Sequence, residues 1–505
     1  MRSSAGFCLL LAASCLGAGM ALPQAARAAS DDATIVLPVP FSNIDACNIS
    51  SESGIISREN IVETLTQLDP VDSSPKPRLA LSWQQTGPLT WRVVLRQGVK
   101  FHDGASFDSK ALAAAVDRML DPKLECLDRL RYMRDVGLTV TVVDDHTVDL
   151  GTKTPQPLMP VLMAYIGVGS PNSPRTLSRE PVGTGPFRIA GWRGDQQLTV
   201  QRFDGYWGEK PALARATYLW RAEPALRAAM VQVGEADVAL AIAATDATDK
   251  QTDFAYQNGE TTRLRFVMTA PLDDIRVRRA MNLAIDREGL RDGLFTKDFQ
   301  IATQFFVPRI AGYNPDLKPW RFDPAEAKRL LAAAKADGVP VDREIVLIAR
   351  IGFFPQVQEA MEAMIQMWSD VGLKVRLRMM DRAEWLKLVN KPFAENRGPT
   401  LIQEQHDNTT GDASFTMNFR YRSDGQQSEI AVPALDRILD QANAASGEER
   451  RKLFQEANRM AAEDIVPDVL MFYMVNYIRI APRLDFRPTN VNSTQLELSD
   501  IHVRN

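Results

Sequence analysis

Residues 344–380 constrain the fold most, because an apolar strand, an amphipathic helix and a second strand follow one another there. Residues 344–351 are predicted to form a strand, residues 357–371 a helix and residues 374–380 another strand. This order is typical of a parallel sheet covered by helices. The sequence therefore predicts an α/β fold for this half of the chain.

Turn and cap residues add further elements of both kinds. Asp323 can cap a helix, Pro324 fits its first turn and Glu326 can reach back to the cap, so a helix to about residue 338 is predicted. Turn residues centred on 144–145 and 194–195 predict two hairpins. We also expect strands at 33–39, 91–96 and 470–480, and helices at 58–68, 107–120, 275–285, 433–444 and 448–462.

The first 28 residues have the pattern of an export signal. Arg2 supplies a positive start, residues 7–22 are apolar, and Ala26-Arg27-Ala28 forms a cleavage site. The apolar run is shorter than the roughly 20 residues that a membrane-spanning helix needs. We expect residues 1–28 to be removed and the mature protein to be periplasmic.

Two cysteines, Cys47 and Cys126, would remain in the exported chain. An even pair in an oxidising compartment favours a disulfide between them. Two buried free thiols are the alternative.

Composition and motifs exclude several functions. The 505 residues exceed what one core needs and predict two or three domains. A net charge of -4 argues against nucleic acid binding, which requires a basic surface. The sequence contains no metalloprotease, nucleophile-elbow or phosphate-loop motif, and its four histidines lack metal-ligand spacing. We therefore expect a protein that is not an enzyme and needs no cofactor or metal.

Several segments together resemble the family 5 extracellular solute-binding proteins, which include dipeptide-, oligopeptide- and nickel-binding proteins. They occur in the family's order and cover most of the chain. The segments are 59–65 (ENIVETL), 77–83 (PRLALSW), 95–104 (LRQGVKFHDG), 182–187 (VGTGPF), 203–208 (FDGYWG), 275–281 (IRVRRAM) and 284–287 (AIDR).

The resemblance implies a two-lobed periplasmic binding protein fold of the α/β class, with a hinge between the lobes and an extra inserted domain. It assigns residues 31–56, 183–270 and 484–505 to lobe I and residues 271–483 to lobe II. Residues 57–182 would form the inserted small domain of lobe I.

The resemblance also implies ligand-binding positions. Asp407 matches, in a changed sequence context, an acid that holds a peptide amino group in dipeptide-binding relatives. Arg350 matches, within one residue, an arginine that binds the peptide carboxylate, and a guanidinium forks well onto a carboxylate. Trp385, expected in a loop near Asp407, and the neighbouring His406 and Glu404 are further pocket candidates. Trp368 and Tyr473 are possible walls of a large pocket.

The implied function is capture of short peptides for import by an ABC transporter. The expected partners are the ligand and the permease subunits, and the protein would act as a monomer. Changes around Asp407 leave an opine, a sugar conjugate or a metal chelate open as ligand. A periplasmic hydrolase of peptides or cell-wall fragments is the alternative of another class.

Overall fold

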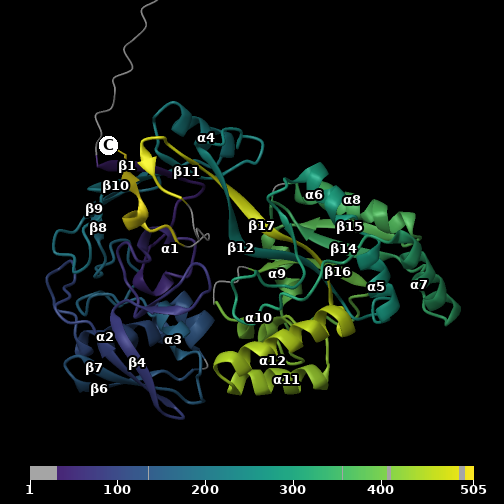
Figure 1. Ribbon diagram of the computed structural model, residues 1–505, viewed down its shortest axis with the longest axis horizontal. Coiled ribbons are helices and arrows are strands. Elements are labelled where there is room, and N and C mark those ends of the chain that lie inside the picture. The colour runs from purple at the N-terminus through teal and green to yellow at the C-terminus, as the bar shows by residue number, and fades with distance from the viewer. Residues whose placement is uncertain (1–30, 135, 355, 407–410, 488–494, 505) are drawn as a thin grey trace, which may run out of the picture.

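The computed structural model describes residues 31–134, 136–354, 356–406, 411–487 and 495–504. Two lobes lie side by side, and two long strands run between them (Figure 1). The first lobe is built on the N-terminal half of the chain, with the C-terminal residues packed onto it. No helix within the described ranges is both long and apolar enough to cross a bilayer.

One mixed sheet of 11 strands extends through both lobes. In the first lobe β1 pairs in parallel with β10 and β11, and in the second β14 pairs in parallel with β15 and β16. The spatial order is β15 (Val375–Met380), β14 (Ile345–Arg350), β16 (Thr400–His406), β12 (Asp253–Phe266), β17 (Asp468–Ile480), β11 (Val238–Ile242), β1 (Asp32–Leu37), β10 (Arg215–Trp220), β9 (Gln197–Arg202) and β8 (Phe187–Arg193), with β13 (Gln300–Ile301) beside β17.

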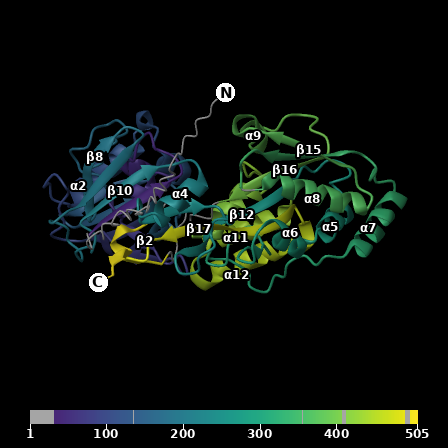
Figure 2. The same cartoon turned by 90° about the horizontal axis from the view of Figure 1, so that it is seen from above.

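Strands β12 and β17 connect the lobes (Figure 2). They pair antiparallel from Asp253 opposite Arg479 at one end to Arg265 opposite Asp468 at the other. The register is interrupted between Gln257 and Thr261, where Gly259 has a φ of 81°. Glycine adopts such a backbone angle without steric cost, so the long ladder bends at this point.

A small antiparallel sheet of order β4-β5-β7-β6 lies at the base of the first lobe (Figure 1). Helix α2 packs against β6, and Asp108 caps that helix by accepting a hydrogen bond of 2.8 Å from the amide of Ala111. The elements here are α1 (Gly54–Ser57), β2 (Thr66–Leu68), β3 (Pro75–Pro77), β4 (Ala80–Gly87), β5 (Thr90–Leu95), α2 (Ser109–Leu120), β6 (Thr139–Asp144), β7 (Thr147–Gly151), α3 (Met159–Leu162) and, beside β11, α4 (Pro224–Gln232).

Helices pack against the parallel strands of the second lobe. Helix α8 packs on β14 and β15, and α5 packs on α7 and β17, around a core that includes Trp368. A second cluster joins α10, α11 and α12. The elements are α5 (Ile275–Leu283), α6 (Arg287–Leu294), α7 (Pro324–Ala336), α8 (Val357–Asp370), α9 (Arg382–Val389), α10 (Ala413–Arg420), α11 (Pro433–Ala444) and α12 (Gly447–Arg459), with β18 (Leu484–Asp485) and β19 (His502–Val503) back on the first lobe.

The helix predicted at residues 58–68 is wrong. Residues 58–65 are irregular and buried, Thr66–Leu68 form strand β2, and Glu59 has a φ of 59°. Polar side chains in this segment form hydrogen bonds with residues far away in the sequence. The Asn60 side-chain amide, for example, donates to the carbonyl of Leu496 at 2.7 Å. A Cβ on Gly183 would lie 2.0 Å from the carbonyl oxygen of Ile61, so a glycine-rich segment packs directly on this backbone. The spacing of apolar residues predicts a helix here, but it cannot show that other parts of the chain surround the segment.

The expected disulfide is also not found, since Cys47 and Cys126 are both buried free thiols. The Cys126 Sγ donates to the carbonyl oxygen of Cys47 at 3.0 Å. Hydrogen bonding to Cys126, together with burial, raises the pKa of the Cys47 thiol above its usual range. Because disulfide chemistry requires a thiolate, this environment disfavours oxidation.

Candidate functional site

A cleft of about 1570 Å³ opens between the two lobes. Its first-lobe wall comes from residues 130–136 and 154–165, which include α3. Its second-lobe wall comes from Arg350 at the end of β14, from Gln405 on β16, from α9 and from residues 414–426, which include α10. Helices α3 and α10 face each other across it (Figure 1). A pocket of this size holds a ligand larger than one amino acid.

The first-lobe wall is mainly apolar. Tyr132 and Tyr165 pack with ring centroids 4.1 Å apart, and five aliphatic side chains extend the surface beside them. Arg131 lies at its edge and donates to the carbonyl of Ser50 at 3.0 Å. This wall suits the apolar parts of a ligand. The aliphatic residues are Leu130, Val136, Leu158, Val161 and Leu162.

Arg350 is the last residue of β14 and faces the cleft. Its amide donates to the Gln403 side chain at 3.0 Å, and its guanidinium carbon lies 3.6 Å from the centroid of the Phe353 ring. Trp385 lies below, 5.4 Å away, and its indole donates to the carbonyl of Gln403 at 2.8 Å. The two aromatic rings therefore hold the Arg350 guanidinium at the C-terminal end of β14.

The charges lining the cleft are predominantly positive. Six of the described lining residues are arginines and three are acids. Arg134, Arg350 and Arg382 have no ion pair with any carboxylate in the described ranges, whereas Arg422 is paired to Asp424 at 2.8 Å. Burial, and next the charge of Arg382, lower the pKa of Arg350 from its ordinary value. The cleft is therefore suited to an anionic ligand.

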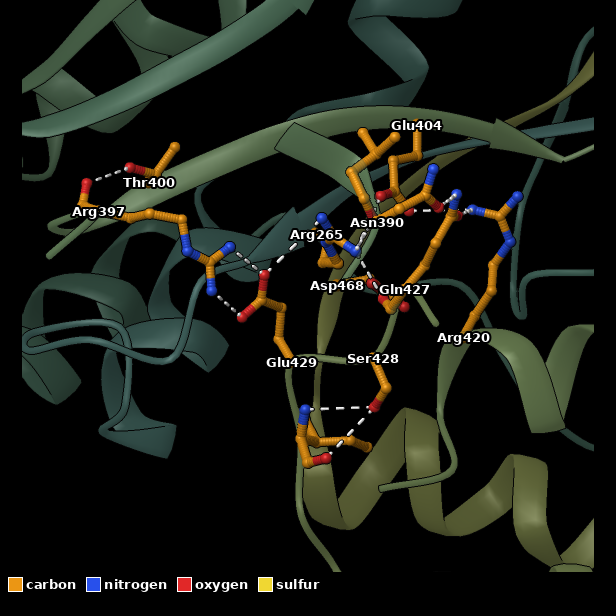
Figure 3. A network of polar contacts seen from close by, with 12 residues as sticks. Arg265, Asn390, Arg397, Thr400, Glu404, Arg420, Gln427, Ser428, Glu429 and Asp468 are labelled. Atoms are coloured by element: carbon orange, nitrogen blue, oxygen red, sulfur yellow. Dashed lines mark hydrogen bonds and ion pairs between the residues drawn. The ribbon is translucent and has the colours of Figure 1, made fainter. Parts of the chain in front are cut away.

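Glu404 lies behind this wall, in the network shown in Figure 3. It is fully buried, and its carboxylate contacts Arg263 at 2.6 Å, Arg265 at 3.1 Å and Arg420 at 3.1 Å. Burial by itself would raise the pKa of Glu404, but the three guanidiniums hold it below its ordinary value. Glu404 is thus a buried anion that positions cations, and only Arg420 of these partners reaches the cleft.

The same network continues away from the cleft. Arg263 also pairs with Asp468 at 2.9 Å. Figure 3 shows Arg397 beside Glu429, to which it donates a hydrogen bond of 2.7 Å. The Arg265 Nη1 donates to the carbonyl of Val389 at 3.1 Å. Strands β12, β16 and β17 are therefore tied to the loops behind the cleft by charge-assisted hydrogen bonds.

The structure brings together two of the five residues predicted as ligand contacts, since Arg350 and Trp385 line the same cleft. Trp385 lies on α9 and not in a loop, because Asp381 caps a helix there by accepting from the amide of Glu384 at 2.9 Å. Glu404 is enclosed by arginines. His406 ends β16, but its side chain lies outside the described residues, as does the whole of Asp407.

Two aromatic residues proposed as walls belong instead to the core. Trp368 is fully buried and donates to the carbonyl of Met281 at 2.9 Å, and Tyr473 is 2% exposed. Sequence reasoning missed Arg382 and the apolar first-lobe wall. Arg382 follows β15 as Arg350 ends β14, so the rule that ligands lie at the carboxyl ends of parallel strands could have identified it. Within the described ranges, no three acids, histidines or cysteines are grouped to hold a metal.

Comparisons with known proteins agree with this architecture. Residues 74–427 match the family described as bacterial extracellular solute-binding proteins, family 5 middle. The chain is 28% identical over 418 residues to the glutathione-binding protein GsiB of Salmonella paratyphi A, covering 80% of each chain.

Solved structures of the same shape include the ABC transporter substrate-binding protein CtaP of Listeria monocytogenes. Its TM-score is 0.81 at 19% identity, over 94% of this chain and 99% of that one. The periplasmic binding protein DppA of Helicobacter pylori, in complex with the peptide STSA, has a TM-score of 0.73 at 18% identity, over 94% and 98% of the two chains. The match of the family model to most of the chain, on a two-lobed fold with a cleft, shows that this protein belongs to family 5 of the bacterial extracellular solute-binding proteins, the substrate-binding proteins of ABC transporters.

Proposed function

We propose that this protein is the periplasmic receptor of an ABC importer for short peptides that carry a free carboxylate. The observation that carries the proposal is the Arg350 guanidinium, fixed on two aromatic rings at the cleft wall and without an ion-paired carboxylate among the described residues. A peptide C-terminus would supply the missing anion in a two-pronged geometry. The apolar wall on the first lobe would contact the side chains of the bound peptide without strong selection among residue types.

The relatives support a peptide ligand. The curated relatives are glutathione-binding proteins, and glutathione is itself a tripeptide; the DppA structure holds a four-residue peptide. Asp407 remains our candidate for the peptide amino group. Export by the segment at residues 1–28 would place the receptor in the periplasm, where the closed, loaded form would dock on the permease.

The mechanism requires no covalent step. A ligand that touches both walls binds more tightly to the closed arrangement of the lobes than to the open one. It therefore shifts the population toward closure by this difference in affinity. Discrimination by the permease between open and closed forms would then make import depend on ligand.

The first test identifies the ligand. Purified protein is mildly denatured, the released small molecules are analysed by mass spectrometry, and calorimetric titration follows with the peptides found and with glutathione. A stoichiometric peptide supports the proposal. A sugar conjugate or metal chelate in its place would contradict it.

The second test locates the carboxylate. We expect Arg350→Gln to weaken binding of a free-acid peptide at least tenfold, because a charge-assisted pair is lost. The same substitution should change binding of the C-terminally amidated peptide less than threefold. Equal loss for both peptides would remove Arg350 from the carboxylate site.

A further inference from the structure

Arg350 and Arg382 stand at the ends of two neighbouring parallel strands. In the ladder between β14 and β15, Arg350 is opposite Met380, and the amide of Ile351 donates to the Met380 carbonyl at 2.8 Å. Arg382 follows Met380 by two residues and is the first residue of α9. The two arginines therefore leave the sheet at the same edge, and both line the cleft.

Two guanidiniums at one edge repel each other unless an anion lies with them. Neither arginine has an ion-paired carboxylate within the described part of the chain. After burial, the charge of Arg382 is the largest influence that lowers the pKa of Arg350, and it is larger than the opposite effect of Glu260 or of Glu52 taken singly. Positive charge therefore gathers at this edge without an ion-paired carboxylate among the described residues.

Arg350 is also held in place, whereas Arg382 is exposed on the first turn of α9. The rings of Phe353 and Trp385 lie under the Arg350 guanidinium, and Trp385 is one turn along α9 from Arg382. The Gln403 side chain and carbonyl fix both the end of β14 and the indole. Arg350 is thus preorganised, so its side chain loses little conformational entropy when an anion binds.

We propose that Arg350 and Arg382 together bind two carboxylates at one end of the ligand, so that the receptor prefers peptides ending in aspartate or glutamate. Arg350 takes the terminal carboxylate and Arg382 takes the carboxylate of the last side chain. This rests on the proposed peptide function and adds the specificity to it. Arg382 is thus a specificity residue that was found from its place in the structure and not by matching sequence positions with relatives.

Calorimetric titration of two peptides tests the pair: Ala-Ala-Glu and Ala-Ala-Gln, which have nearly the same shape but differ by one charge. We expect the wild-type protein to bind the glutamate peptide at least tenfold more tightly. Arg382→Gln should reduce this preference to less than twofold while changing affinity for the glutamine peptide little. Lys387→Gln, which removes an exposed charge from the same helix, should keep the preference.

Three results would overturn this specificity. They are equal affinity of the wild-type protein for the two peptides, an equal loss for both in Arg382→Gln, and a lost preference in Lys387→Gln. Circular dichroism melting of each variant separates these results from misfolding. Failure to bind any peptide, with a different ligand found by mass spectrometry, would instead reject the proposed function.

Discussion

At the scale of single residues, burial decides whether a charged side chain meets ligand or supports the wall behind it. Glu404 and Arg350 lie on adjacent strands, yet Glu404 is fully buried among three arginines while Arg350 is only partly covered. The sequence identified both positions as polar residues near a predicted site. It could not separate them, because two of the three arginines that enclose Glu404 come from β12, more than 100 residues earlier in the chain.

Neutralising Glu404 should destabilise the fold. Glu404→Gln leaves Arg263 and Arg265 buried without their shared anion, and removal of one partner from a buried ion pair costs about 3–5 kcal/mol. We expect a loss of this order in the free energy of unfolding, measured by urea denaturation. Glu395→Gln, at an exposed position, should change it by less than about 0.5 kcal/mol. Similar values for the two variants would show that the network contributes little stability.

At the scale of elements, local signals predicted well what local interactions decide. The helix from Pro324 begins where expected, because the Asp323 side chain accepts from the amide of Glu326 at 2.9 Å. The strand, helix and second strand between 344 and 380 are confirmed within about two residues. Segment 58–68 failed because its conformation is set by contacts with chain more than 100 residues away. Contacts of this kind leave no periodic pattern.

The loop around His102 should make stability depend on pH. The His102 Nε2 donates to the Gly185 carbonyl at 2.9 Å, and Nδ1 accepts from the Gly183 amide, so the ring is neutral. Burial lowers the pKa of His102 to about 4. The unfolded chain binds a proton near pH 6.5 and the folded chain only near 4, so this stability is present above pH 6.5 and is lost as pH falls toward 4.

Urea denaturation between pH 4 and 7 measures this contribution. The wild-type free energy of unfolding should rise with pH across that window, and His102 should contribute roughly 3 kcal/mol of this rise. His102→Gln should flatten the rise by this amount. His502→Gln, at an exposed position, should not, and an identical slope in all three proteins would exclude His102 as the source.

At the scale of the whole molecule, closure of the cleft depends on the strands that join the lobes. The interrupted ladder between Gln257 and Thr261 is where β12 bends, and Glu260 from this stretch lines the cleft. A change of backbone angles at Gly259 would rotate one lobe against the other with few other contacts broken. We expect this stretch and the facing part of β17 to form the hinge.

Small-angle X-ray scattering tests closure directly. The radius of gyration should decrease when the wild-type protein is saturated with its peptide, because the two walls approach. Arg350→Gln, which should bind at least tenfold more weakly, should need at least ten times more peptide for the same decrease. An unchanged radius in the saturated wild type would mean that ligand binds without closing the lobes.

The path of β17 has a consequence for how the protein is made. This strand lies between β11 and β12, and the last described residues pack onto Asn60 through the carbonyl of Leu496 and the amide of Leu498. The first lobe, which begins with β1 at Asp32, therefore receives its final strand and the segment that covers Asn60 only from residues beyond 467. Until then its sheet keeps an open edge, so a nascent chain should stay incompletely folded, and a chain cut before residue 468 should be degraded by proteases.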